Sequence, residues 1–79
     1  MKGNFYIEKN NKKVKCDILY TFNYNDENYI IYNDGSIDEI GYLNVLANKF
    51  IINDDKITLL DIDDYDWNII DKVWSDING

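Results

Sequence analysis

Short clusters of asparagine and aspartate divide this chain into runs in which apolar and polar residues alternate. The clusters are Asn10-Asn11, residues 25–28, residues 33–36 and residues 53–55. Asn and Asp tolerate the left-handed backbone of tight turns, and their side chains bond the neighbouring main chain. Asp34-Gly35 is in addition a strong hairpin signal. A period-2 alternation between such turns predicts strands that follow one another in an antiparallel meander.

The turns leave five predicted strands, at about residues 4–8, 13–23, 28–32, 42–52 and 56–61. The second is the clearest, because its apolar residues recur at every other position and are expected to share one face, with Leu19 as the exception. These residues are Val14, Cys16, Ile18, Tyr20 and Phe22. The fourth run is long, and a bulge or break is expected near Ala47-Asn48. Residues 36–41 fit either a loop or one helical turn.

The apolar period changes to a helical spacing near the end of the chain. From Asp64 onward, apolar residues fall at i, i+3, i+6, i+7 and i+10, which predicts a helix over about residues 64–77. They are Trp67, Ile70, Val73, Trp74 and Ile77. Asp63 or Asp64 is the expected N-cap, and Asn78-Gly79 the expected C-terminal cap. The apolar face of the sheet is where this stripe can be buried. The expected fold is therefore α+β, an antiparallel meander of about five strands with one C-terminal amphipathic helix packed on the sheet.

Length and composition limit the chemistry of the chain. Seventy-nine residues make a single domain, residues 1–79. Histidine is absent, which removes His-based acid–base catalysis and nucleophilic triads, and the one cysteine excludes an internal disulfide. Cys16 falls on the expected core face and is interpreted as a buried apolar thiol. No enzyme activity, cofactor or metal site is expected, and both a monomer and a homodimer remain open.

The apolar runs are too short for a membrane span. The first residues, Met1-Lys2-Gly3-Asn4, lead into no apolar region of the kind that a signal peptide has. A lone thiol fits a reducing compartment, so the expected location is the cytoplasm.

Positively and negatively charged residues are unevenly distributed along the chain. Residues 1–16 hold five lysines and one acid, residues 17–79 hold three lysines and fourteen acids, and the total is −7. Direct nucleic-acid binding is not expected, because most of the chain would repel phosphates. The densest acidic segment, residues 61–66, lacks the glycine and the glutamate that an EF-hand loop needs at its sixth and twelfth positions. Many acids are also turn residues, and a net charge of this size is ordinary for a small soluble domain.

The order of these signals resembles a known family. A strand ending in Thr21-Phe22 precedes the strand Glu27–Tyr32, and an acidic turn and an apolar strand then lead to a helix that opens with residues 64–67, Asp-Tyr-Asp-Trp. This order is similar to that of domain-of-unknown-function family 1292 (DUF1292), small acidic proteins of low-GC Gram-positive bacteria and their mobile elements. The likeness covers nearly the whole chain, which departs from the family in its Asp and Asn usage, its lysine-rich start and residues 36–41. The resemblance implies a small α+β fold and a cytosolic location, and it supplies no catalytic residue.

These observations favour a small acidic, non-enzymatic protein-binding module with a regulatory role. Its partner is expected to be a protein with a basic surface, bound through acids and through exposed tyrosines, which bury much area while keeping a polar tip. The expected contacts are Asp54, Asp55, Asp61, Asp63, Asp64, Tyr24, Tyr32 and Tyr42. The alternative is a phage- or mobile-element-encoded inhibitor, of anti-CRISPR or anti-restriction type, that blocks a basic nucleic-acid-binding groove by acidic mimicry. A small carboxylate-based or metal-dependent enzyme is the least favoured class.

Overall fold

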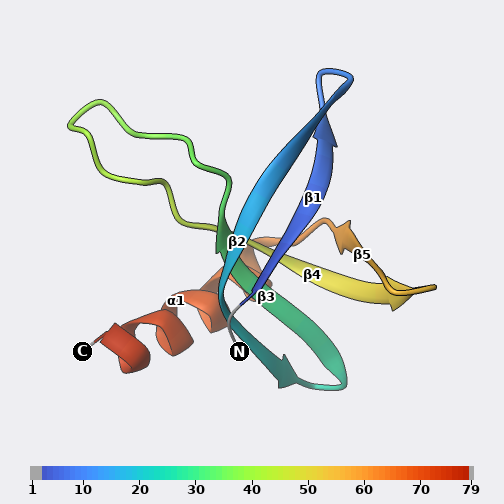
Figure 1. Ribbon diagram of the computed structural model, residues 1–79. Coiled ribbons are helices and arrows are strands. Elements are labelled where there is room, and N and C mark those ends of the chain that lie inside the picture. The colour runs from blue at the N-terminus through green and yellow to red at the C-terminus, as the bar shows by residue number, and fades with distance from the viewer. Residues whose placement is uncertain (1–2, 79) are drawn as a thin grey trace.

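A computed structural model describes residues 3–78 and shows five strands followed by one helix (Figure 1). The elements are β1 (Gly3–Lys9), β2 (Lys12–Tyr24), β3 (Glu27–Asn33), β4 (Leu46–Asn53), β5 (Lys56–Leu60) and α1 (Asp64–Asn78). Each strand pairs antiparallel with the next, in the sheet order β1-β2-β3-β4-β5. The predicted α+β fold is therefore confirmed. Met1, Lys2 and Gly79, the residue expected in the C-terminal cap, lie outside the described residues.

Three of the four connections between strands are two-residue turns with a left-handed backbone. The φ angles are 54° and 62° at Asn10-Asn11, 53° and 62° at Asn25-Asp26, and 48° and 66° at Asp54-Asp55. Positive φ at both central positions is the mark of a type I′ turn, whose twist matches that of the paired strands. Asn and Asp enter this region more readily than other side chains because they bond locally. The turn clusters of the sequence therefore set the hairpin geometry.

A β-bulge at Leu19 reverses the apolar pattern of β2. The register against β3 slips by one residue between Ile18 and Tyr20. One extra residue moves every later side chain to the other face of the sheet. The expectation that the apolar residues of β2 share one face is therefore wrong. Ile18 and the apolar residues before it lie on the face away from α1, whereas Tyr20 and Phe22 lie on the face that α1 covers.

The sheet is consequently apolar on both faces. On the helix side, Ile70 of α1 packs with Tyr29, Ile31 and Ala47. On the other side, the sheet curls around a cluster to which every strand contributes. Its members are Phe5, Ile7, Cys16, Ile18, Ile30, Tyr32, Leu46, Phe50, Ile57 and Leu59. The central strand β3 is buried on both sides, so its apolar residues are consecutive rather than alternating.

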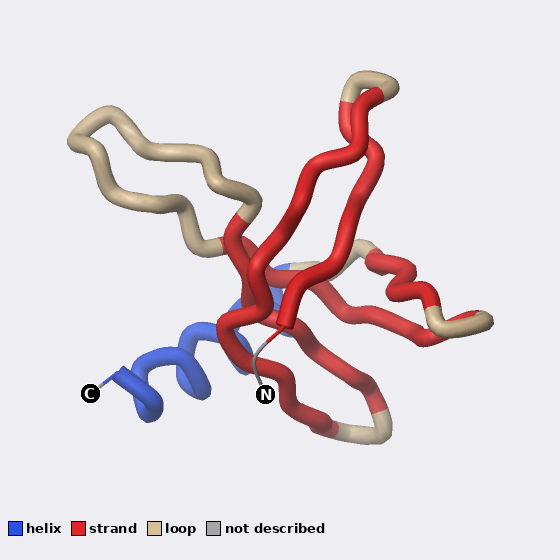
Figure 2. Tube along the Cα trace, in the orientation of Figure 1, coloured by secondary structure: helices blue, strands red, loops and turns tan. Residues whose placement is uncertain are grey.

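β4 begins at Leu46, four residues later than expected, because residues 34–45 form a long connection. This connection projects from the sheet as a narrow arm at the upper left of Figure 1, drawn as a tan loop in Figure 2. The predicted bulge near Ala47-Asn48 is absent, since β4 pairs in regular register with both β3 and β5. Ala47 is instead buried where α1 crosses β4.

α1 ends with the Asn78 side chain, whose Nδ2 donates to the carbonyl of Trp74 at 2.9 Å. In the described part of the chain, no helix has the length and apolar character that crossing a membrane requires.

Candidate functional site

The Asp-rich segment before α1 forms the N-terminal cap of the helix. Asp63 Oδ1 accepts a hydrogen bond from the backbone N–H of Asp66 at 3.0 Å, and Asp66 Oδ2 accepts one from the N–H of Asp63 at 3.1 Å. The Asp63 carbonyl also accepts from the Trp67 N–H at 3.0 Å. This reciprocal arrangement is a capping box. Asp63 is therefore the N-cap, as one of the two sequence alternatives proposed.

Asp66 connects this cap to the sheet. Its carboxylate is buried; Oδ1 accepts a hydrogen bond from the Tyr29 hydroxyl at 2.7 Å, and Oδ2 lies 3.5 Å from Lys49 Nζ. The Tyr29 bond, followed by the Asp63 N–H, lowers the pKa of Asp66, while burial and the neighbouring carboxylate raise the pKa of the Tyr29 hydroxyl. The group is held ionised with its oxygens occupied, so it anchors α1 rather than presenting a reactive carboxylate.

Asp66 is the structurally decisive acid of the segment, and it was not among the expected contacts. The signal that identifies it is the spacing Asp63-x-x-Asp66, a capping box in which Asp replaces the usual Glu or Gln. Its link to Tyr29 spans 37 positions along the chain, and no local pattern reveals that contact.

The other expected acids do not gather at one place. Asp54 and Asp55 form the turn before β5, whereas Asp61 and Asp64 follow it at the other end. Asp55 and Asp61 are six residue steps apart along β5, roughly 20 Å at the usual rise of a strand. All four residues are exposed. They therefore form two small acidic sites rather than one continuous acidic face.

The three expected tyrosines are also dispersed. Tyr24 is exposed at the end of β2, and Tyr42 is exposed in the connection between β3 and β4. Tyr32 is only 5% exposed, so the expectation that it is a surface anchor is wrong. Its ring packs edge-on against Phe5, with centroids 5.3 Å apart, and its hydroxyl donates to Asn48 Oδ1 at 2.7 Å. Tyr32 is a core residue because β3 is the central strand and is covered on both faces.

The arm between β3 and β4 carries the largest group of exposed apolar side chains along a short stretch of the chain. Their exposed fractions run from 46% to 77%. We call this group the loop surface; it consists of Ile37, Ile40, Tyr42, Leu43 and Val45. Of the expected contacts, Tyr42 alone belongs to it. The sequence reasoning missed the apolar residues at 37 and 40 because residues 36–41 were interpreted as a connection, and the one at 43 because it was assigned to the strand 42–52.

The arm is held by its own hydrogen bonds. Asp38 Oδ1 accepts from the backbone N–H groups of Ile40 and Tyr42, at 3.0 and 2.9 Å. The Asn44 N–H donates to the Ser36 carbonyl at 3.0 Å, and the Asn44 side chain donates to the Ser36 hydroxyl at 2.9 Å. The backbone N–H groups of Tyr42 and Asn44 are bonded within the arm and cannot pair with a neighbouring strand of the sheet. For this reason residues 42–45 lie outside β4.

The base of the arm is fixed to the first hairpin. Lys9 Nζ lies 3.7 Å from Asp34 Oδ2, and Asp34 Oδ1 accepts from the Ser36 N–H at 2.9 Å. The bonds from Ser36 lower the pKa of Asp34, so this carboxylate stays ionised at neutral pH. Lys9 therefore pairs within the fold instead of offering free positive charge to a phosphate.

The loop surface continues into a groove beside α1. The groove has a volume of about 160 Å³ and lies between Val45 at the end of the arm and Trp67 and Trp74 on the helix. Trp67 is 40% exposed there. Val45 belongs to both features, so the exposed apolar area extends from the arm onto the helix.

The thiol and the possible metal ligands of residues 3–78 form no reactive site. Cys16 is fully buried, and burial, followed by Asp34 and Asp17, raises the pKa of its thiol. Among residues 3–78, no group of three or more carboxylate or thiol side chains is arranged to hold a metal ion.

The comparison with known families identifies one family for the chain. Residues 9–79 match the family described as "Protein of unknown function (DUF1292)". No curated protein and no solved structure matches the chain. The matched span runs from the end of β1 through α1, so it includes the arm, the helix cap and most of the sheet. The chain belongs to the DUF1292 family.

Proposed function

We propose that this chain is a non-enzymatic, cytoplasmic protein-binding module with a regulatory role, and that the loop surface makes the principal contact. The observation that carries the proposal is the concentration of five large apolar side chains on one projecting arm. Single exposed apolar residues are normal on protein surfaces, whereas a contiguous group of them marks an interaction site. The absence of histidine and the burial of Cys16 support a role that does not depend on catalysis.

The internal order of the arm supports binding. A segment that folds only on association pays the conformational entropy of ordering at that moment, which lowers its affinity. Here Asp38 and Asn44 already fix the backbone around Ile40 and Tyr42. The arm can therefore enter a partner's pocket at a small entropic cost.

The charges beside the arm define the partner's chemistry. Glu39 is exposed between Asp38 and Ile40, and Asp71 lines the groove beside α1. A matching partner has an apolar pocket for Ile40 and Tyr42 with lysine or arginine at its rim. The apolar contact supplies affinity, and the rim charges increase the association rate and orient the complex.

The test compares matched variants in affinity purification from the organism that encodes the chain. Ile40→Ser combined with Tyr42→Ser removes the most exposed apolar pair of the arm, and both side chains lie outside the core, so stability should not change. Ile52→Ser is the control, because Ile52 is 65% exposed but lies at the far end of β4. We expect one protein to be retained by the wild type and by the control but lost with the arm variant. Retention by the arm variant would contradict the proposal.

Acidic mimicry of a nucleic acid is the alternative function, and salt distinguishes it. Exposed charges are screened over about 10 Å at 0.1 M salt. A mimic would therefore lose its partner at high salt and when Asp54, Asp55, Asp61 and Asp64 are replaced together by asparagine. Binding through the loop surface should survive both changes. The separation of these acids into two groups at opposite ends of β5 favours the loop surface.

A further inference from the structure

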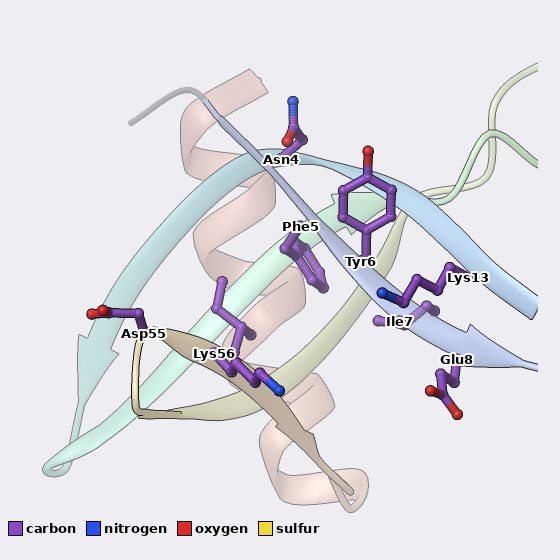
Figure 3. A pocket seen from close by; sticks show the side chains of 9 residues that line it. Asn4, Phe5, Tyr6, Ile7, Glu8, Lys13, Asp55 and Lys56 are labelled. Atoms are coloured by element: carbon purple, nitrogen blue, oxygen red, sulfur yellow. The ribbon is translucent and has the colours of Figure 1, made fainter.

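The two edge strands of the sheet, β1 and β5, face one another across a slot. The slot has a volume of about 430 Å³ and is lined by both strands, as Figure 3 shows. Its apolar part comes from Phe5 and Ile7 of β1 and from Ile57 of β5, which belong to the cluster enclosed by the curled sheet. The curl therefore nearly closes a barrel, but β1 and β5 are not paired with each other.

The geometry of the first hairpin identifies which backbone groups of β1 face the slot. Lys9 and Lys12 flank a two-residue turn, so they form a hydrogen-bonded pair, and such pairs alternate along an antiparallel ladder. The ladder is regular throughout β1. The N–H and C=O groups of Asn4, Tyr6 and Glu8 therefore point away from β2 and towards the slot.

The same reasoning applies to β5. Asn53 and Lys56 flank a two-residue turn and begin a regular ladder with β4. The alternation then directs the N–H and C=O groups of Ile57 and Leu59 away from β4. The slot thus has unpaired backbone donors and acceptors along both sides, the pattern to which an added strand binds.

The odd number of strands fixes the relative direction of the two edges of the slot. Successive strands of the meander alternate in direction, so β1 and β5 run the same way. A strand inserted between them has the same orientation relative to both, and an antiparallel one would continue the alternation of the meander and complete a six-stranded barrel. The long connection between β3 and β4 projects away from the slot and does not fill it (Figure 1).

We propose that this slot binds one extended segment of another protein by strand addition. Alternate residues of the segment are apolar and face Phe5, Ile7 and Ile57. The residues between them are polar and uncharged, because Lys13 and Lys56 at the rim are balanced by Glu8 and Asp55. This site is separate from the loop surface, and the proposal does not depend on that surface.

A second copy of the chain does not suit the slot. The inward side chains of its own edge strands, such as Phe5 and Leu59, are already part of its apolar cluster, so neither edge strand is free to enter another slot. A net charge of −7 on each copy also opposes self-association.

The test is a selection from a displayed library of random linear peptides of about nine residues, the length of an ordinary strand. We expect enriched peptides to alternate apolar and polar residues. Their affinity is then measured for the wild type, for Tyr6→Pro and for Tyr6→Thr. Tyr6→Pro removes a donor that faces the slot, at an edge position where proline is tolerated, whereas Tyr6→Thr removes the same ring but keeps the N–H. We expect Tyr6→Pro to weaken binding about tenfold relative to Tyr6→Thr, because one hydrogen bond is lost and its acceptor is left unpaired.

Amide hydrogen exchange tests the site without a substitution. In the free protein, the amides of Tyr6, Glu8, Ile57 and Leu59 should exchange rapidly, and the bound peptide should protect them. A selection without enrichment, or binding that neither depends on the Tyr6 N–H nor protects these amides, would overturn the proposal. Self-association in sedimentation experiments that Tyr6→Pro abolishes would assign the slot to a second copy and would also overturn it.

Discussion

Replacing Tyr29 with phenylalanine removes one hydroxyl group and tests whether Asp66, in the first turn of α1, is structural. The Tyr29 ring is buried between the sheet and the helix, so the substitution keeps the packing and deletes only the 2.7 Å hydrogen bond to Asp66. Hydrogen bonds to charged groups contribute about 1.5–3 kcal/mol to stability. Near the middle of that range, the loss should lower the Tm by roughly 8–16 °C, since 1 kcal/mol shifts the Tm of a domain this small by about 4–8 °C.

The loss of unfolding free energy caused by Tyr29→Phe should become smaller at low pH. The Tyr29 hydroxyl is the leading cause of the lowered pKa of Asp66 in the folded protein, whereas an unfolded Asp titrates near about 3.9. A carboxyl group whose pKa is lowered by folding stabilises the protein fully above its unfolded pKa. That contribution is lost as the pH falls through the lower folded pKa. The difference in unfolding free energy between wild type and Tyr29→Phe should therefore be full above about pH 4 and should shrink below it.

The measurement is urea unfolding followed by tryptophan fluorescence, because Trp67 and Trp74 both lie on α1 and report its release from the sheet. Tyr24→Phe is the control, since it removes an exposed tyrosine hydroxyl at the end of β2. Two results would refute the reasoning: equal stability of Tyr29→Phe and the control, or a penalty that persists unchanged at pH 2.5, well below the pKa of an ordinary carboxyl group.

Three further predictions concern the bulge, a turn and the thiol. Deletion of Leu19 should preserve the cooperative unfolding transition, because Tyr20 would then follow Ile18 directly and would keep its face in a regular ladder with β3; loss of the transition in a circular-dichroism melt would contradict this. Asp55→Gly should raise the unfolding free energy by up to about 1 kcal/mol, because glycine adopts a φ of 66° without strain, and a lower Tm would show that the carboxylate itself stabilises the turn. Cys16 should react with Ellman's reagent at the rate of unfolding rather than as an exposed thiol, because it is buried and its pKa is raised; immediate labelling of the native protein would show that the core opens.

Local chemistry made most of the fold predictable. The expected helix at 64–77 and the expected first and last strands agree with α1, β1 and β5 to within a residue or so at each end. The candidate site was much less predictable. The expected contacts were chosen by residue type, and type does not distinguish Tyr42 on the arm from Tyr32 in the core. Burial is a property of the whole sheet, and only the central position of β3 decides it.

The sequence by itself determined the turns, the strand count, the helix and its cap, because each depends on residues within a few positions of one another. Asn10-Asn11, Asn25-Asp26 and Asp54-Asp55 adopt left-handed turns between alternating runs, and the spacing of Asp63 and Asp66 specifies a capping box. The bulge and the slot were decided by tertiary structure alone. The bulge at Leu19 exists because the two halves of β2 must face different apolar layers. The slot exists because five antiparallel strands curl until the two edge strands face one another without pairing. These features depend on contacts between residues distant in the chain, which periodicity and turn chemistry do not encode.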